Sequence, residues 1–164
     1  MNVYSSLLDA AVVETLKNGG VAVIPTDTLY GICGRADMPD TVERIYELRN
    51  RDRDKRMIVL IADVVEGMPS AVRNYWPGKV SIVIGETAYR LPDYHELREL
   101  LRQAGPLVAP SANFQGQEPA HTIAEAQAYF GDAVDCYVDV GRLDGAPSRI
   151  IKIEEGGETT VLRA

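Results

Sequence analysis

Short runs of purely apolar residues recur along this chain and alternate with segments that have helical periodicity. The run at 21–24 (VAVI) contains no polar residue, which is typical of a strand buried on both faces of a sheet. Residues 6–18 precede it with apolar side chains three and four positions apart, as in an amphipathic helix. Similar apolar runs stand at 57–61 and 106–109, and residues 80–84 are apolar apart from Ser81. This alternation predicts an α/β fold with a twisted, mixed sheet flanked by helices.

The remaining elements follow from the same two periods and from signals at their ends. A second helix is expected at 38–50, capped by Asp37 or Asp40. Residues 63–75 show a weaker helical pattern. Thr122 begins another helix, because a glutamate three positions later completes a capping box. The other expected elements are a helix at about 94–104 and strands at 136–140, 149–153 and 159–162.

Length and charge limit the kind of protein this can be. The 164 residues suffice for a single domain over 1–164. The 17 Lys and Arg against 24 Asp and Glu leave a net charge of −7, which argues against extended nonspecific binding of nucleic acid. No apolar run approaches the roughly 20 residues of a membrane-spanning helix, and no secretory signal pattern opens the sequence. We therefore expect a cytoplasmic protein that does not contact membranes.

Metal and disulfide chemistry are not expected. The two cysteines and two histidines are isolated in the sequence, whereas a structural metal site needs about four ligands. A reducing compartment also favours two free thiols over a disulfide.

Four polar loops follow apolar strands or lie at strand ends, at 25–31, 90–92, 110–116 and 147–149. Ligand sites in open α/β sheets favour such strand-end crevices, so we expect these loops to converge on one pocket. The side chains expected there are Thr28, Arg90, Ser111, Asn113 and Ser148. Arg51 and Lys55, two cations of the basic segment at 49–56, are expected to join them. Hydroxyl donors beside guanidinium groups suit a ligand that carries both carboxylate and phosphate.

Each of these signals has a plainer interpretation when it is taken singly. A Thr-Asp-Thr sequence after a strand is often turn or capping chemistry, and interleaved aspartates can neutralise the basic run at 49–56. No GxxxxGK[ST] or GxGxxG pattern occurs, so a nucleotide would have to bind without a P-loop or a dinucleotide-binding turn. No side chain stands out as a catalytic nucleophile.

Several short motifs occur together in a fixed order, and the set is far more specific than its members. They are PTDTLYG at 25–31, RNR at 49–51 with DK at 54–55, WPG at 76–78, PSAN at 110–113 with Gly116, DVG at 139–141, PSRI at 147–150 and LR at 162–163. Over residues 6–163 the chain thereby resembles the YrdC-like family of threonylcarbamoyl-AMP synthases.

The resemblance implies a YrdC-like fold and a nucleotidyltransferase. Such an enzyme combines L-threonine, bicarbonate and ATP into threonylcarbamoyl-AMP, releases pyrophosphate, and uses ATP together with Mg²⁺. Its product serves a downstream threonylcarbamoyl transferase that modifies tRNA. By the same resemblance, the threonine contacts would be Thr28, Arg90, Ala109 and Ser148. The ATP contacts would be Arg51, Lys55, Ser111, Asn113, Thr122 and Arg163.

The sequence also departs from the family pattern. Arg49 stands where the family prefers Lys, and the interval at 79–89 is shorter than the usual hairpin, which predicts one open wall of the pocket. Two alternatives therefore stay open. One is a noncatalytic YrdC-like module that binds RNA or nucleotide. The other is an enzyme acting on carbamoyl phosphate, like the related domain of hydrogenase maturation proteins.

Overall fold

Ten strands, four α-helices and two 3₁₀ helices make up the computed structural model, which describes residues 1–164. In chain order they are β1 (Val3–Tyr4), α1 (Ala10–Lys17), β2 (Ala22–Pro25), β3 (Tyr30–Arg35), α2 (Pro39–Arg49), β4 (Val59–Leu60), η1 (Ser70–Asn74), β5 (Val80–Ile84), β6 (Thr87–Arg90), α3 (His95–Ala104), β7 (Leu107–Val108), α4 (Ile123–Phe130), η2 (Gly131–Ala133), β8 (Cys136–Val138), β9 (Arg149–Ile153) and β10 (Thr159–Arg163).

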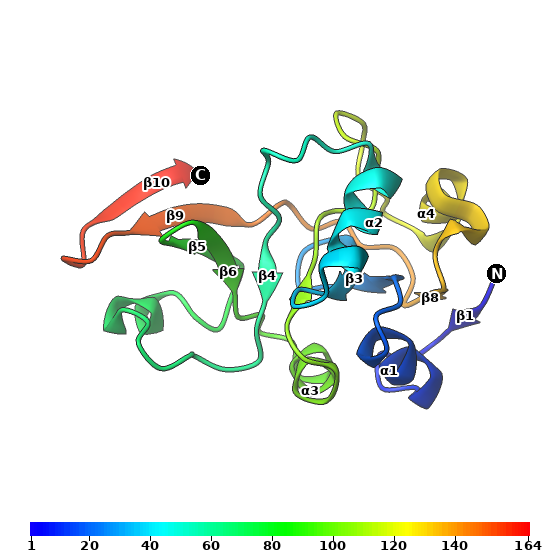
Figure 1. Cartoon of the computed structure of the whole chain (residues 1–164), viewed down its shortest axis with the longest axis horizontal. Coiled ribbons are helices and arrows are strands. Elements are labelled where there is room, and N and C mark those ends of the chain that lie inside the picture. Colours follow the sequence, from blue (N-terminus) through cyan, green and yellow to red (C-terminus); the bar gives the residue numbers. More distant parts are fainter.

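The strands form one mixed sheet in the order β1-β8-β2-β3-β7-β4-β6-β5-β9-β10. The pairs β2–β3, β3–β7 and β5–β6 are antiparallel, whereas β2–β8, β4–β6 and β5–β9 are parallel. In Figure 1, α2 and α4 lie on one side of the sheet, and α1 and α3 lie on the other. The predicted α/β fold with a mixed sheet flanked by helices is therefore confirmed.

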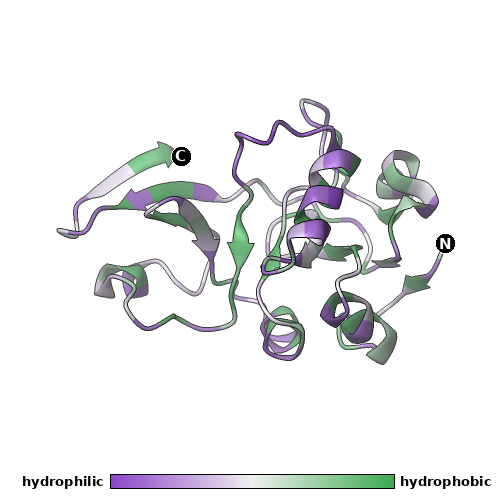
Figure 2. Ribbon diagram, in the orientation of Figure 1, coloured by the Kyte–Doolittle hydropathy of each residue, from purple (hydrophilic) through white to green (hydrophobic).

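The strand β2 lies in the interior of the sheet, and both of its faces are covered. Ala22 and Ile24 belong to an apolar cluster with side chains of α1 and α3. Val21 and Val23, which point the opposite way, belong to a second cluster with α2 and α4. Figure 2 shows β4 as hydrophobic, whereas β9 alternates between hydrophobic and hydrophilic residues and α2 has hydrophilic stretches. Burial on both faces explains why this run has no polar residue.

A third apolar cluster covers one face of the other half of the sheet. Trp76 and Val72 pack there against Ile82 of β5 and Ile151 of β9. The opposite face of the same strands carries Val83, Ala88 and Ile150, which line a cavity. One face of this half of the sheet is therefore covered by apolar side chains, whereas the other face borders the cavity.

Most expected elements are present, but several are shorter than expected and one is different. The strands expected at 106–109 and 136–140 are reduced to β7 (Leu107–Val108) and β8 (Cys136–Val138). The strand expected at 57–61 is reduced to β4, with two residues. The helix expected at 63–75 was wrong, since only Ser70–Asn74 is helical and it is a 3₁₀ helix. Gly67 has a positive φ of 92°, and Pro69 follows at the start of η1, so a continuous α-helix is broken at both positions.

The expected cap of the second helix was also wrong. Met38 occupies the N-cap of α2, and no side chain caps it. The carboxylate of Asp37 accepts two hydrogen bonds from Arg35 instead, at 2.9 and 2.6 Å. By contrast, the Thr122 hydroxyl accepts a hydrogen bond from the Glu125 amide at 3.2 Å and caps α4 as expected.

The short interval at 79–89 forms a tight hairpin rather than a gap. β5 and β6 pair antiparallel, with Ile84 opposite Thr87. Three residues of this hairpin, Val83, Gly85 and Ala88, line the cavity. The short hairpin itself therefore forms part of the cavity wall.

Two further expectations concern thiols and membranes. Cys33 and Cys136 are free thiols, as expected, and the structure buries both of them. None of the helices combines the length and the apolar character that crossing a membrane requires.

The packing of α2 on β3 predicts a stability effect at Gly34. A Cβ atom added there would overlap the Cγ2 methyl of Thr41 and lie 3.1 Å from Cδ1 of Ile45. Overpacking of this kind costs about 1–3 kcal/mol. We expect Gly34→Ala to lower the free energy of unfolding in urea by that amount. Gly156→Ala is the control, because no atom lies within 4 Å of its added Cβ. Equal stability of the two variants would contradict this account.

Candidate active site

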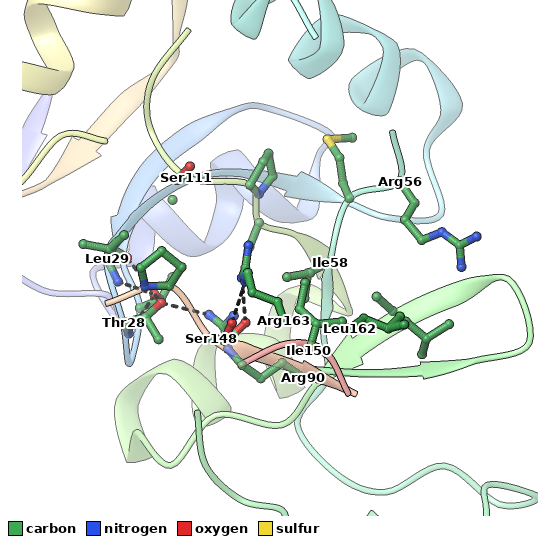
Figure 3. A pocket seen from close by; sticks show the side chains of 18 of the residues that line it. Thr28, Leu29, Arg56, Ile58, Arg90, Ser111, Ser148, Ile150, Leu162 and Arg163 are labelled. Carbon is green, nitrogen blue, oxygen red and sulfur yellow. Dashed lines mark hydrogen bonds between the residues drawn. The ribbon is translucent and has the colours of Figure 1, made fainter. Parts of the chain in front are cut away.

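A cavity of about 590 Å³ borders the face of β5, β6 and β9 that the third apolar cluster leaves uncovered. This volume is within the usual range of ligand pockets, about 300–1,000 Å³. Its walls come from the β2–β3 turn, the segment between α2 and β4, the β5–β6 hairpin, the segment after β7 and the β9–β10 hairpin (Figure 3). The polar side chains that line it are Thr26, Thr28, Tyr30, Arg49, Arg51, Arg56, Arg90, Ser111, Ser148, Lys152 and Arg163.

The charged wall of the cavity is entirely cationic. Six of the lining residues are Arg or Lys, and no Asp or Glu lines it. The chain as a whole carries a net charge of −7, so the acidic residues are placed elsewhere. A concave site lined by one sign of charge focuses the electrostatic field and attracts ligands of the opposite sign. The cavity is thus built for an anionic ligand.

The structure brings most, but not all, of the expected site residues to this cavity. Those that line it are Thr28, Arg51, Arg90, Ala109, Ser111, Ser148 and Arg163. Lys55, Asn113 and Thr122 do not line it. The Lys55 side chain is 52% exposed and lies 4.0 Å from the Asp52 carboxylate, and the Thr122 hydroxyl caps α4. Asn113 lies behind Ser111, as described below.

The β2–β3 turn places Thr28 at the cavity because Thr26 closes the turn from inside. The Thr26 hydroxyl donates to the Leu29 carbonyl at 2.6 Å and accepts from the amides of Thr28 and Leu29, both at 3.2 Å. Gly145 packs so closely on the other side that a Cβ atom there would overlap the Thr28 carbonyl oxygen. The turn is therefore held on both sides, and the Thr28 hydroxyl has a fixed position.

Arg90 reaches the same turn from the end of β6. Its Nε donates to the Asp27 carboxylate at 3.1 Å, and its Nη2 lies 3.4 Å from the Thr28 hydroxyl (Figure 3). Both side chains of the Arg90–Asp27 pair are only 4% exposed. Burial raises the pKa of Asp27, and the charge of Arg90 opposes this shift without cancelling it.

Ser148, which immediately precedes β9, forms hydrogen bonds with residues of β5 and β10. Its hydroxyl lies 2.8 Å from that of Ser81, which is fully buried in β5. Arg163 of β10 donates through Nε to the Ser148 carbonyl at 2.9 Å, and its Nη2 lies 3.4 Å from the Ser148 hydroxyl (Figure 3). Burial, and then the nearby charge of Arg90, lower the pKa of Arg163. Two guanidinium groups therefore stand close together without a carboxylate between them in the cavity.

A second cationic group forms where α2 ends. Arg49 is 3% exposed, and its Nε donates to the carbonyls of Ser111 and Asn113 at 2.8 and 3.0 Å. Its Nη1 is buried and has no hydrogen-bond partner. Burial and then the charge of Arg51 lower the pKa of Arg49 to about 10, so it stays cationic at neutral pH. Arg49 lines the cavity, so its guanidinium places a positive charge beside any anion that binds there.

Two neighbours shape this group. Asn50 adopts the left-handed conformation with φ 51°, which ends α2 and redirects the chain. Arg51 then folds back, and its Nη2 donates to the Arg56 carbonyl at 2.7 Å. Asn113 accepts a hydrogen bond from the Ser111 hydroxyl at 2.6 Å and so orients that hydroxyl. Asn113 therefore acts on the cavity through Ser111.

Five polar residues that line the cavity were not among the expected contacts, namely Thr26, Tyr30, Arg49, Arg56 and Lys152. Two of them had a usable signal in the sequence. Arg49 follows Ile45 by four positions and so shares the inward face of α2. Lys152 follows Ile150 by two positions and so shares the cavity face of β9. Arg56 lies across the cavity from Thr28 in Figure 3, and nothing in its local sequence indicated that it, rather than Lys55, would line the wall.

Comparison with known proteins identifies the family. Residues 14–164 match the sequence profile of the Sua5/YciO/YrdC family, whose description reads "Telomere recombination". The chain belongs to this family. It is 32% identical to the threonylcarbamoyl-AMP synthase of Marinobacter nauticus, over 87% of this chain and 90% of that protein. It is 31% identical to a putative threonylcarbamoyl-AMP synthase of Mycobacterium tuberculosis, over 92% of this chain and 81% of the relative.

A solved structure of the family has the same fold. P. abyssi Sua5 complexed with L-threonine matches 99% of this chain with a TM-score of 0.85 and 22% identity. The present chain spans 56% of the length of that protein. The YrdC-like fold that the motifs implied is therefore confirmed.

The cationic side chain of Arg49 at the cavity wall predicts a measurable anion site. We expect Arg49→Met to weaken the binding of pyrophosphate by about 1.5–3 kcal/mol, the usual range for a hydrogen bond to a charged group. Isothermal titration calorimetry measures this affinity, and circular dichroism shows whether the variant is folded. Arg53→Met is the matched control, because Arg53 pairs with Glu43 on the surface and does not line the cavity. Unchanged pyrophosphate affinity in a folded Arg49→Met protein would remove Arg49 from the site.

Proposed function

We propose that this protein is an L-threonylcarbamoyladenylate synthase, a nucleotidyltransferase that forms threonylcarbamoyl-AMP and pyrophosphate from L-threonine, bicarbonate and ATP. One observation carries the proposal, namely a single cavity with only cationic charged residues and with two groups of hydrogen-bond donors. The names of the related synthases, and the L-threonine in the Sua5 structure, support this choice of substrates.

The first group of donors suits the amino acid. Arg90 presents Nη atoms beside the Thr28 hydroxyl, so a carboxylate can accept from the guanidinium while a polar atom of the ligand bonds the hydroxyl. The Ser148 hydroxyl lies on the same side of the cavity in Figure 3. Ala109 adds a small apolar side chain to the cavity wall. These four residues form the proposed L-threonine site.

The second group suits the nucleotide. Arg49, Arg51 and the Ser111 hydroxyl line the cavity together, and Arg56 and Lys152 add further positive charge. We assign the triphosphate to these cations. Arg163 donates to the Ser148 carbonyl, and burial and then the charge of Arg90 lower the pKa of Arg163. We assign the α-phosphate to Arg163, because that phosphate must stand beside the amino acid for the reaction to occur.

The chemistry needs positioning and charge neutralisation more than a side-chain nucleophile. The threonine amine adds to bicarbonate and loses water, which gives a carbamate. A carbamate oxygen then attacks the α-phosphorus, and the bond to the β-phosphate breaks to release pyrophosphate. Holding the two anions in contact requires cations on both, which this cavity supplies.

Mg²⁺ enters as part of the ATP substrate. No carboxylate lines the cavity, so phosphate oxygens of ATP, cavity hydroxyls and water would hold the ion. The proposal also includes a cytoplasmic location and transfer of the product, by a separate threonylcarbamoyl transferase, to tRNA.

The proposal predicts pyrophosphate release that depends on both L-threonine and bicarbonate. The purified protein is incubated with Mg²⁺ and ATP, and each of the other two substrates is omitted in turn. Arg51→Ala and Ser111→Ala should each weaken ATP binding by about 1.5–3 kcal/mol, the usual range for a hydrogen bond to a charged group. Arg51→Ala removes a guanidinium donor, and Ser111→Ala removes a hydroxyl whose proton turns from Asn113 to a phosphate oxygen when ATP binds. Arg53→Ala, outside the cavity, should bind ATP like the unchanged protein.

Other outcomes would point to the alternatives. Folded protein that binds tRNA in a salt-dependent way but releases no pyrophosphate would favour a noncatalytic module. Activity with carbamoyl phosphate and none with L-threonine would favour the hydrogenase-maturation type of reaction. ATP affinity that is unchanged in both Arg51→Ala and Ser111→Ala would overturn the assignment of the nucleotide site.

A further inference from the structure

Asp27 is a carboxylate next to the cavity that the proposed reaction leaves without a role. It lies in the β2–β3 turn between Thr26 and Thr28, yet it does not line the cavity. Its side chain is 4% exposed, and Oδ1 accepts the hydrogen bond from Arg90 Nε at 3.1 Å. Arg90 therefore stands between Asp27 and the cavity.

The Arg90–Asp27 pair is not arranged as a stabilising ion pair. The second oxygen of Asp27, Oδ2, is buried and has no hydrogen-bond partner. A buried charge that is only partly satisfied costs free energy, and replacing such a group by a neutral one is often neutral or stabilising. The raised pKa of Asp27 agrees with this, since a folded-state pKa above the unfolded value means that the ionised form at neutral pH lowers stability.

The geometry of the pair controls which edge of Arg90 faces the ligand. The Arg90 backbone is fixed, because β6 pairs with β4 and the Arg90 carbonyl accepts from the Ile61 amide at 3.0 Å. The side chain still has several rotatable bonds, whose freedom is worth about 1.5–2 kcal/mol for an arginine. Asp27 holds Nε, so the Nη1 and Nη2 edge is left for the cavity, beside the Thr28 hydroxyl.

Asp27 also balances charge. Arg90 and Arg163 are close enough that the charge of Arg90 lowers the pKa of Arg163. The Asp27 carboxylate compensates one of these two cations from outside the cavity, which allows both guanidinium groups to remain close together before an anion binds.

We propose that Asp27 is a positioning residue, whose carboxylate holds the Arg90 guanidinium with its outer edge turned toward the amino-acid carboxylate. The proposal rests on the proposed function. It adds a residue that affects L-threonine affinity without lining the cavity itself. Asp27 does not touch the substrate in this arrangement and acts through Arg90.

The test uses Asp27→Asn and Asp27→Ala in the full chain. Calorimetry gives the dissociation constants of L-threonine and of ATP, and thermal unfolding gives Tm. We expect L-threonine binding to weaken about tenfold in Asp27→Ala and less in Asp27→Asn, which keeps a neutral acceptor. ATP affinity should stay within about twofold of its original value, because its proposed contacts are unchanged. The Tm of Asp27→Asn should not fall. Asp63→Asn is the matched control, because that aspartate pairs with Arg98 and Arg102 on the surface.

A double-mutant cycle separates positioning from general structural damage. If Asp27 acts through Arg90, then Asp27→Asn should have no further effect on L-threonine affinity in an Arg90→Met background. An equal loss in both backgrounds, or unchanged L-threonine affinity in folded Asp27→Ala, would overturn the proposal. Failure of the proposed function gives a different result, because the unchanged protein itself would then bind ATP but not L-threonine. In that case Asp27 would have no role in L-threonine binding.

Discussion

Burial of β2 on both faces is the constraint on which the rest of the structure depends. Val21 and Val23 pack under α2 and α4, while Ala22 and Ile24 pack under α1 and α3. Such a strand cannot slip by one residue without moving its side chains to the opposite face. The turn that follows β2 is therefore anchored, and through it so is the Thr28 hydroxyl.

The second determinant is the separation of charge. An acidic chain presents a cavity with only cationic charged residues because its carboxylates are engaged elsewhere. Glu43 pairs with Arg53 on the surface, and Asp52 lies near Lys55 outside the cavity. Asp27 is close to the cavity but lies behind Arg90. The site thereby combines strong attraction for anions with a negative net charge overall.

The parts of the fold that could be predicted were those with an uninterrupted local period. β5 and α3 stand where the pattern placed them, and α4 begins at the cap provided by Thr122. β3 was missed because Gly31 and Gly34 interrupt its apolar pattern. Gly34 is nevertheless needed in that strand, since α2 packs directly on it. In this case close packing of helix on sheet removed the signal by which the strand would have been recognised.

The candidate site was predictable in its chemistry and only partly in its members. The motifs identified hydroxyls and guanidinium groups for an amino acid and a nucleotide, but they favoured Lys55 over Arg56 and passed over Arg49 and Lys152. A short side chain such as that of Thr28 follows its backbone closely. A long cationic side chain can point in several directions, and its contacts with distant segments select one.

The sequence by itself determined the classes of element, the order of the loops and the family, because each of these depends on residues that are close neighbours in the chain. Only the tertiary structure decided which polar groups face the cavity and which form hydrogen bonds within the protein instead. Arg49 shows the reason, because its direction is set by the carbonyls of Ser111 and Asn113, more than 60 residues away. Contacts at such separation form only when the sheet has brought its strands together, so no local pattern records them.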